Sequence, residues 1–76
     1  MRDLVERIIK QIVDYPNEVK VQEIEGGRIT IVEISVAKED VGKVIGREGR
    51  VANALRTIVG AVASKLGKRA IVEIIE

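Results

Sequence analysis

Glycines and basic residues come together in one short segment of this 76-residue chain, residues 42–50. Its glycines are Gly42, Gly46 and Gly49. A dinucleotide-binding fingerprint would need a further glycine at position 44, where the chain has Val44, and a P-loop would need Gly-Lys-Ser or Gly-Lys-Thr, which the chain lacks. Both motifs also follow a strand directly, and none is expected here. The segment is therefore neither of these nucleotide-phosphate loops.

The remaining interpretation is a G-x-x-G turn over residues 46–49 that joins two helices. Glycine at both ends lets the backbone come close to another chain. The helix that begins after the turn offers unpaired N–H groups and the positive end of its dipole, which suits a phosphate. Arg47 can contact a phosphate directly, and Arg50 and Lys43 are further candidates. A plain turn with solvated arginines is the alternative, and the flanking residues favour phosphate binding.

Apolar periodicity predicts a helix near the N-terminus, followed by a hairpin. Asp3 with Glu6 three residues later forms a capping box at the helix start. Pro16 ends the helix. Gly26 and Gly27 supply the tight turn between two strands of alternating apolar residues.

A long helix is expected after the glycine turn. Its predicted buried face consists of Val51, Leu55, Ile58, Val59, Val62 and Leu66. Gly67 suits a left-handed C-cap, and three basic residues favour the negative end of the helix: Lys65, Lys68 and Arg69. Gly60 lies inside this helix, and we attribute it to close packing among neighbouring alanines.

These elements together predict an α+β fold. Three strands form one sheet, with three helices packed on one face, in the order αββααβ. The predicted elements are a helix over 3–14, strands over 19–25 and 28–36, helices over 38–45 and 50–66, and a strand over 70–75.

Composition excludes several function classes. The chain has no cysteine and no histidine, which rules out disulfides, thiol chemistry and zinc-finger ligation. Without a clustered pair of carboxylates we expect no enzyme, metal or cofactor. Residues 1–37 hold five basic and seven acidic side chains, and residues 38–76 hold eight and five, which mildly favours a polyanionic partner. No signal peptide or run of roughly 20 apolar residues is present, so we expect a soluble cytoplasmic protein that does not bind membranes.

The run Val44-Ile45-Gly46-Arg47-Glu48-Gly49-Arg50 resembles the signature of KH domains, whose loop clamps about four nucleotides of single-stranded RNA. The element order is similar to the bacterial type II arrangement. The runs 36–46, 54–57 and 72–75 resemble the small stand-alone bacterial KH proteins of the KhpA (YlqC) family. This resemblance covers essentially the whole chain and implies a single KH domain over residues 1–76. Glu48 and Lys38 depart from the pattern, in which a less acidic loop and a proline are expected.

The family resemblance implies a groove beside the loop, between the short helix, the start of the long one and the adjoining strand. Four aliphatic residues are candidates to carry the bases, and for each of them a core role is an equal alternative: Val41, Val44, Ile45 and Val51. Asn53 is a candidate at the groove edge. With no Phe or Trp and one Tyr, base recognition must rely on aliphatic contacts and hydrogen bonds to base edges.

The sequence therefore predicts a non-catalytic protein that binds single-stranded RNA. The resemblance implies an RNA chaperone or post-transcriptional regulator linked to cell elongation and division. It also implies a larger multidomain KH partner of the KhpB/Jag/EloR type, and a homodimer is an additional expectation. The alternatives are a protein-interaction or dimerisation module, favoured by the acidic Glu48 and the near-neutral charge, and a binder of single-stranded DNA.

Overall fold

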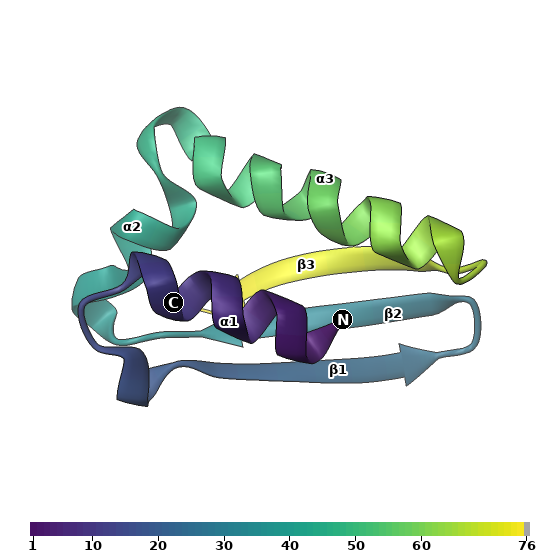
Figure 1. The fold of residues 1–76 in the computed structure, drawn as a ribbon, viewed down its shortest axis with the longest axis horizontal. Coiled ribbons are helices and arrows are strands. Elements are labelled where there is room, and N and C mark those ends of the chain that lie inside the picture. The colour runs from purple at the N-terminus through teal and green to yellow at the C-terminus, as the bar shows by residue number, and fades with distance from the viewer. Residues whose placement is uncertain (76) are drawn as a thin grey trace.

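The computed structural model describes residues 1–75. Besides helices and strands, these residues form three short 3₁₀ turns, labelled η. Figure 1 shows the elements in order: α1 (Arg2–Ile12), η1 (Pro16–Glu18), β1 (Lys20–Gly26), β2 (Ile29–Ser35), η2 (Lys38–Asp40), α2 (Val41–Ile45), η3 (Arg47–Gly49), α3 (Arg50–Lys65) and β3 (Arg69–Ile75).

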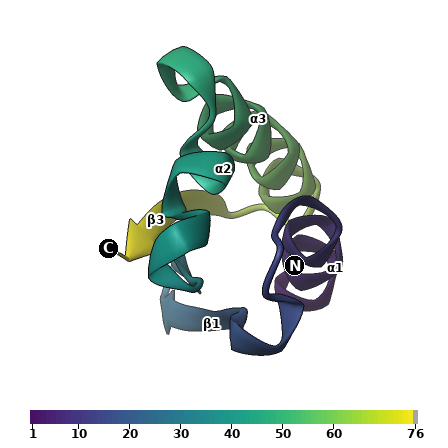
Figure 2. The ribbon, with the colours of Figure 1, turned by 90° about the vertical axis from the view of Figure 1, so that its left-hand side faces the viewer.

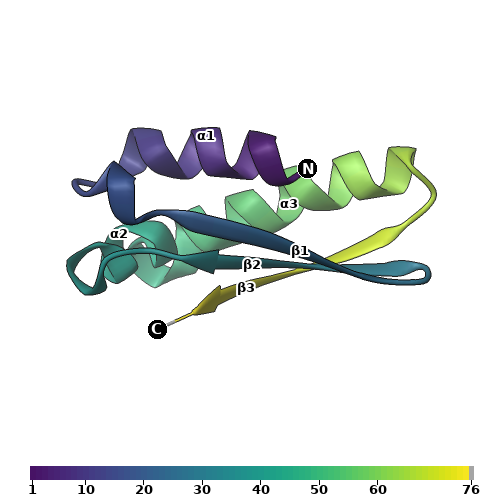
Figure 3. The ribbon, with the colours of Figure 1, turned by 90° about the horizontal axis from the view of Figure 1, so that it is seen from below.

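The three strands form one mixed sheet in the order β1-β2-β3. β1 pairs antiparallel with β2, and β3 pairs parallel with β2. The α-helices cover one face of this sheet, as the end-on view and the view from below show (Figures 2 and 3). The predicted α+β class and element order are confirmed.

The core lies between the sheet and the helices. Alternate residues of each strand point toward the helices, so that Val32 and Ile34 of the central strand are fully buried. They pack against one face of α1 and one face of α3. The buried apolar cluster comprises Val5, Ile9, Val13, Val19, Val21, Val32, Ile34, Val44, Leu55, Val59 and Val72. Each such side chain stabilises the fold by about 1.5–3 kcal/mol, which holds α2 and α3 in fixed positions.

The opposite face of the sheet is uncovered. The register places Ile24, Ile31 and Ile71 in one row across the three strands. Ile24 and Ile71 are among the exposed large apolar residues of the chain. This face therefore presents an apolar row to the surroundings.

The predicted capping box at the N-terminus is wrong. α1 begins at Arg2, one residue before Asp3, and no side chain caps it at its N-cap position, Met1. The Arg2 N–H instead donates to Glu23 Oε1 of β1 at 2.8 Å. A contact across the fold has replaced the local one that the sequence pattern indicated.

The hairpin loop lies one residue later than predicted. Gly26 is the last residue of β1 and pairs with Ile29, so that Gly27 and Arg28 form the loop. Gly27 has a φ of +70°, which a side chain would disfavour.

The C-terminal end of α3 confirms the predicted glycine C-cap and corrects the predicted role of Lys68. Gly67 has a φ of +72°, and the Lys68 N–H donates to the Ala63 carbonyl at 2.8 Å, so a glycine C-cap closes the helix as predicted. The Lys68 ammonium, however, lies 2.9 Å from Glu25 Oε2 of β1 and not on the helix end. Its hydrogen bond lowers the pKa of Glu25.

Two residues of the predicted buried face of α3 are exposed. Ile58 is 42% exposed and Leu66 is 60% exposed. Leu66 lies at the C-cap, beyond the end of the sheet-facing turns. Ile58 faces away from the sheet, toward a cleft beside α1 that nothing in residues 1–75 fills. The apolar stripe of α3 is thus wider than the surface that the sheet covers.

Gly60 is not explained by close packing. A Cβ at this helical position would meet no atom within 4 Å, which contradicts the predicted packing against alanines. We therefore expect Gly60→Ala to raise the free energy of unfolding by about 1 kcal/mol, or roughly 4–8 °C in thermal midpoint followed by circular dichroism. Gly67→Ala is the control: its Cβ is equally unobstructed, but its φ of +72° makes alanine destabilising. A lower midpoint for Gly60→Ala would contradict this account.

No helix among residues 1–75 is long and apolar enough to cross a membrane. Within the same range, no three acidic side chains converge in a way that could hold a metal ion.

Candidate nucleic-acid interface

The G-x-x-G loop is a tight elbow between α2 and α3, at the end of the molecule farthest from the sheet in Figure 1. α2 closes with a hydrogen bond from the Gly46 N–H to the Gly42 carbonyl at 2.9 Å. The Gly49 N–H then donates to the Gly46 carbonyl at 3.1 Å, which folds residues 46–49 into a single turn. Gly46, Glu48 and Gly49 all have positive φ, at 78°, 56° and 74°. The loop is therefore an irregular, well-defined backbone structure.

Gly46 is required by both conformation and space. Its φ of 78° and ψ of 170° lie in a region that essentially only glycine populates. A Cβ there would come within 2.6 Å of Val51 Cγ2 and 2.8 Å of the Val51 backbone nitrogen. At Gly49 the nearest atom to a Cβ would be Asn53 Nδ2, at 3.8 Å. The first turn of α3 thus packs directly on the first glycine of the loop and leaves the second one open.

Arg47 lies within the loop and Arg50 directly follows it, and both side chains are exposed. Within residues 1–75, neither guanidinium forms an ion pair, and Glu48 forms none either. Glu48 therefore reduces the local positive charge without binding Arg47. Both arginines are available to an anion at the N-terminal end of α3.

Lys43 points to a different part of the fold. Its ammonium lies 2.6 Å from Asp14 Oδ2 and 3.8 Å from Asp40 Oδ1. The hydrogen bond to Asp14 raises the pKa of Lys43 above its ordinary value. This side chain is engaged by the turn that follows α1.

The structure separates the four aliphatic candidates. Val44 is fully buried in the core, so the core role applies to it. Val41, Ile45 and Val51 are half-buried. Val51 packs against the core cluster and supports Gly46, whereas Val41 lines an open cleft. Val41 is the one of the four that lines this cleft, and Val51 contributes to a separate apolar cleft between α1 and α3.

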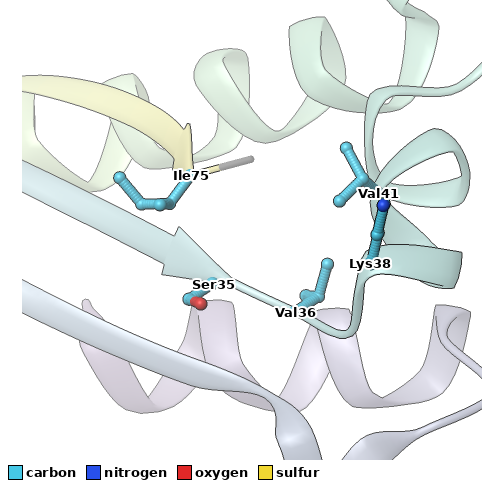
Figure 4. Close-up of a pocket in the computed structure, with 5 residues that line it drawn as sticks. All are labelled: Ser35, Val36, Lys38, Val41 and Ile75. Atoms are coloured by element: carbon cyan, nitrogen blue, oxygen red, sulfur yellow. The ribbon is translucent and has the colours of Figure 1, made fainter.

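This cleft opens where the C-terminal ends of β2 and β3 face the start of α2. It has a volume of about 640 Å³. Figure 4 shows the side chains around its opening, which are Ser35, Val36, Lys38, Val41 and Ile75. The walls are largely aliphatic, and a hydroxyl and an ammonium provide polar groups.

Sequence reasoning missed four of these five residues. Ser35 and Ile75 are partners in the parallel register of β2 and β3. Val36 and Lys38 belong to the connection that leads from β2 into α2. Two features could have indicated these residues: the parallel pairing of the last two strands and the short connection that follows residue 35.

Asn53 lies one turn into α3, below Gly49. Its side-chain oxygen accepts a hydrogen bond from Arg56 Nη1 at 3.1 Å, and both residues are exposed. The pair lies on the same helix as Arg50.

A second, apolar cleft of about 230 Å³ lies between α1 and α3. It is lined by Ile8, Ile12, Arg50, Val51, Ala54, Leu55 and Ile58. Its walls are almost entirely apolar, unlike those of the first cleft.

Comparison with known proteins identifies the family. A family model described as "KhpA/KhpB, KH domain" matches residues 2–74. The chain belongs to this KH-domain family. The predicted family is confirmed, and the matched range includes the elbow at 46–49.

Curated relatives support this assignment over the full length. The chain is 52% identical over 75 residues to "RNA-binding protein KhpA" of Clostridium acetobutylicum, covering 99% of this chain and 100% of the relative. It is 46% identical over 76 residues to the protein of that name from Aquifex aeolicus, covering 100% and 96%. For the Caldanaerobacter subterraneus protein the identity is 55% over 75 residues, covering 99% and 100%.

Proposed function

We propose that this chain acts as one KH domain that binds short single-stranded RNA without catalysis. One observation carries the proposal: the loop, whose backbone at residue 46 requires glycine, brings together two exposed arginines at the start of α3 that form no ion pair within residues 1–75. Membership of a family whose relatives are named RNA-binding proteins supports it.

The loop holds the phosphates in this proposal. The Arg50 N–H donates to the Arg47 carbonyl, so the N–H groups that follow it in the first turn of α3 are the ones offered to a phosphate, where the positive dipole end favours an anion. Arg47 and Arg50 add charge-assisted hydrogen bonds. Lys43 contributes less than the sequence pattern indicated, because Asp14 holds its ammonium at 2.6 Å.

The bases lie along α2 in the proposed complex. Val41 and Ile75 provide apolar contact from the two sides of the cleft, with Ile45 leading toward the loop and Asn53 at the edge. Ser35 and Lys38 offer hydrogen bonds to base edges or to a phosphate. Phosphate contacts position the strand, whereas these contacts decide which bases are preferred.

The cellular role that we propose is that of a cytoplasmic RNA chaperone or post-transcriptional regulator. A link to cell elongation and division, and a larger multidomain KH partner of the KhpB/Jag/EloR type, follow from the family alone. The partner would add further RNA contacts to a site that holds only a few nucleotides, which raises affinity through effective concentration.

Salt dependence tests the proposed RNA binding. Neutralising about three phosphates gives a log–log slope of affinity against salt of about −2 for single strands. Fluorescence anisotropy at several salt concentrations measures this slope, with single-stranded DNA of the same sequence as the comparison. Tighter binding of the RNA is expected, because only RNA carries the 2′-hydroxyl. An affinity independent of salt would contradict the phosphate contacts, and equal affinity for DNA would favour a general single-strand binder.

A second candidate function is protein docking, including self-association. The observation that favours it is the apolar cleft between α1 and α3, where Ile58 is 42% exposed. Sedimentation velocity over a wide concentration range tests self-association. A monomer at every concentration would exclude a homodimer and leave a different protein as the partner of this surface.

A further inference from the structure

One acidic side chain in this fold is completely buried. Asp40 has no exposed surface and lies where η2 passes into α2. A buried carboxylate is costly unless hydrogen bonds or opposite charges compensate it. Its partners therefore show what this residue holds in place.

The hydrogen-bond partners of Asp40 lie in the turn that follows α1, 25 and 26 residues earlier in the chain. Asp40 Oδ1 accepts a hydrogen bond from the Asp14 N–H at 3.1 Å, and Oδ2 accepts one from the Tyr15 N–H at 3.0 Å. Lys43 Nζ lies 3.8 Å from Oδ1 and 2.6 Å from the Asp14 carboxylate. The Asp40 carboxylate thus joins the turn after α1 to the beginning of α2. Lys43, one turn later, lies near the carboxylates of both Asp40 and Asp14 on the solvent side.

α2 is only five residues long and is held at both ends. Asp40 fixes its first end to the turn at 14–15. At its last end, Gly46 packs on Val51 of α3. The same short helix presents Val41 to the cleft and carries the loop at its C-terminus. A shift of its first end would move both the cleft wall and the loop.

We propose that Asp40 is a positioning residue for RNA binding, which sets the place of α2 and hence of the loop at 46–49. The inference rests on the proposed RNA-binding function, but the position of the loop can be measured without RNA. Asp40 does not touch RNA in this proposal. It acts through the two backbone hydrogen bonds that hold α2 against the end of α1.

Asp40→Asn is the sharpest variant. Asparagine has the same shape, but its NH₂ group cannot accept the second backbone N–H, so one of the two bonds is lost. In the full chain we expect the backbone amide resonances of Gly46 and Gly49 to shift. We also expect the affinity for a short single-stranded RNA to fall by about five- to tenfold, because apparent affinity falls with the fraction of molecules whose loop is correctly placed.

Two controls separate positioning from general loss of stability. Val59→Ala opens a cavity in the core, at a side chain only 1% exposed in α3, ten residues beyond Gly49. Below its unfolding transition it should bind RNA as the unmodified chain does. Asp14→Asn weakens the external lysine pair but keeps the backbone N–H of residue 14, so it should retain most of the affinity. If Asp40→Asn unfolds, the same substitution in the Gly60→Ala background replaces it.

The proposal is overturned if the folded Asp40→Asn variant keeps the Gly46 and Gly49 resonances and the RNA affinity of the unmodified chain. It is also overturned if Val59→Ala loses as much affinity, since the effect would then be one of stability alone. If the unmodified chain binds no RNA, the proposed function fails, and the amide resonances of the RNA-free variant still decide whether Asp40 positions the loop.

Discussion

Replacing Gly46 by alanine is expected to displace the 46–49 loop and to lower the free energy of unfolding by about 3 kcal/mol. The backbone of Gly46 has a φ of 78° and a ψ of 170°, which alanine strongly disfavours. The new Cβ would also come within 2.8 Å of the Val51 backbone nitrogen, an atom that cannot move without the first turn of α3. The elbow must open, and RNA affinity should fall with it. Urea denaturation and RNA titration of the variant measure the two effects.

Gly49→Ala is the matched control for this prediction. Its φ of 74° gives alanine a conformational penalty of about 1–2 kcal/mol. The nearest atom to its Cβ, Asn53 Nδ2, lies 3.8 Å away and belongs to an exposed side chain. The Gly49 variant should therefore lose clearly less stability than the Gly46 variant. Equal losses would mean that the contact with Val51 does not constrain the loop.

Replacing Arg47 and Glu48 together by aspartate is expected to weaken RNA binding by about tenfold to a hundredfold. The change removes one charge-assisted phosphate contact, worth about 1.5–3 kcal/mol, and adds a negative charge at the same place. Both side chains are exposed, and aspartate tolerates the positive φ of residue 48 better than glutamate does. The fold should persist, which circular dichroism checks, and fluorescence anisotropy measures the affinity.

Arg28→Asp is the control for net charge. Arg28 is exposed in the hairpin loop, at the opposite end of the molecule from the glycine loop (Figure 1). Its substitution makes the same change in total charge as the double variant. If Arg28→Asp loses little RNA affinity and the double variant loses much, the phosphate contacts lie at residues 46–50. Similar losses for both would mean that RNA responds only to overall charge, and unchanged binding by the double variant would exclude the loop as the site.

The sequence predicted the elements of this fold because their signals are local. Alternation in the strands and the 3.6-residue spacing in the helices each reflect one buried face. The glycine C-cap at Gly67 was predictable for the same reason, since the left-handed conformation is a property of a single residue. The capping of α1 was not predictable, because its partner, Glu23, lies 21 residues away along the chain. Lys68 likewise binds Glu25 across the sheet rather than the helix end beside it.

The candidate site also has one part that local sequence predicted and another that depends on tertiary contacts. The loop at 46–49 was visible in the spacing of its glycines and basic residues. The cleft was not, because Ser35 and Ile75 meet only through the parallel register of β2 and β3. Lys43 is basic like the two arginines, but unlike them it forms an ion pair. Its partner, Asp14, is distant in the sequence and close only in the folded chain. Burial of Asp40 is also a tertiary property, since its hydrogen-bond partners lie 25 and 26 residues away along the chain.

In the proposed complex, RNA contacts both the loop at 46–49 and the cleft beside α2. Titration of the ¹⁵N-labelled chain with a short single-stranded RNA tests it most directly, by the shifts of the backbone amide resonances. We expect the largest shifts at residues 46–50, with further shifts at Val41 and Ile75. Shifts confined to Ile8, Ile12 and Ile58 of the cleft between α1 and α3, or to the uncovered sheet face around Ile24, would contradict it.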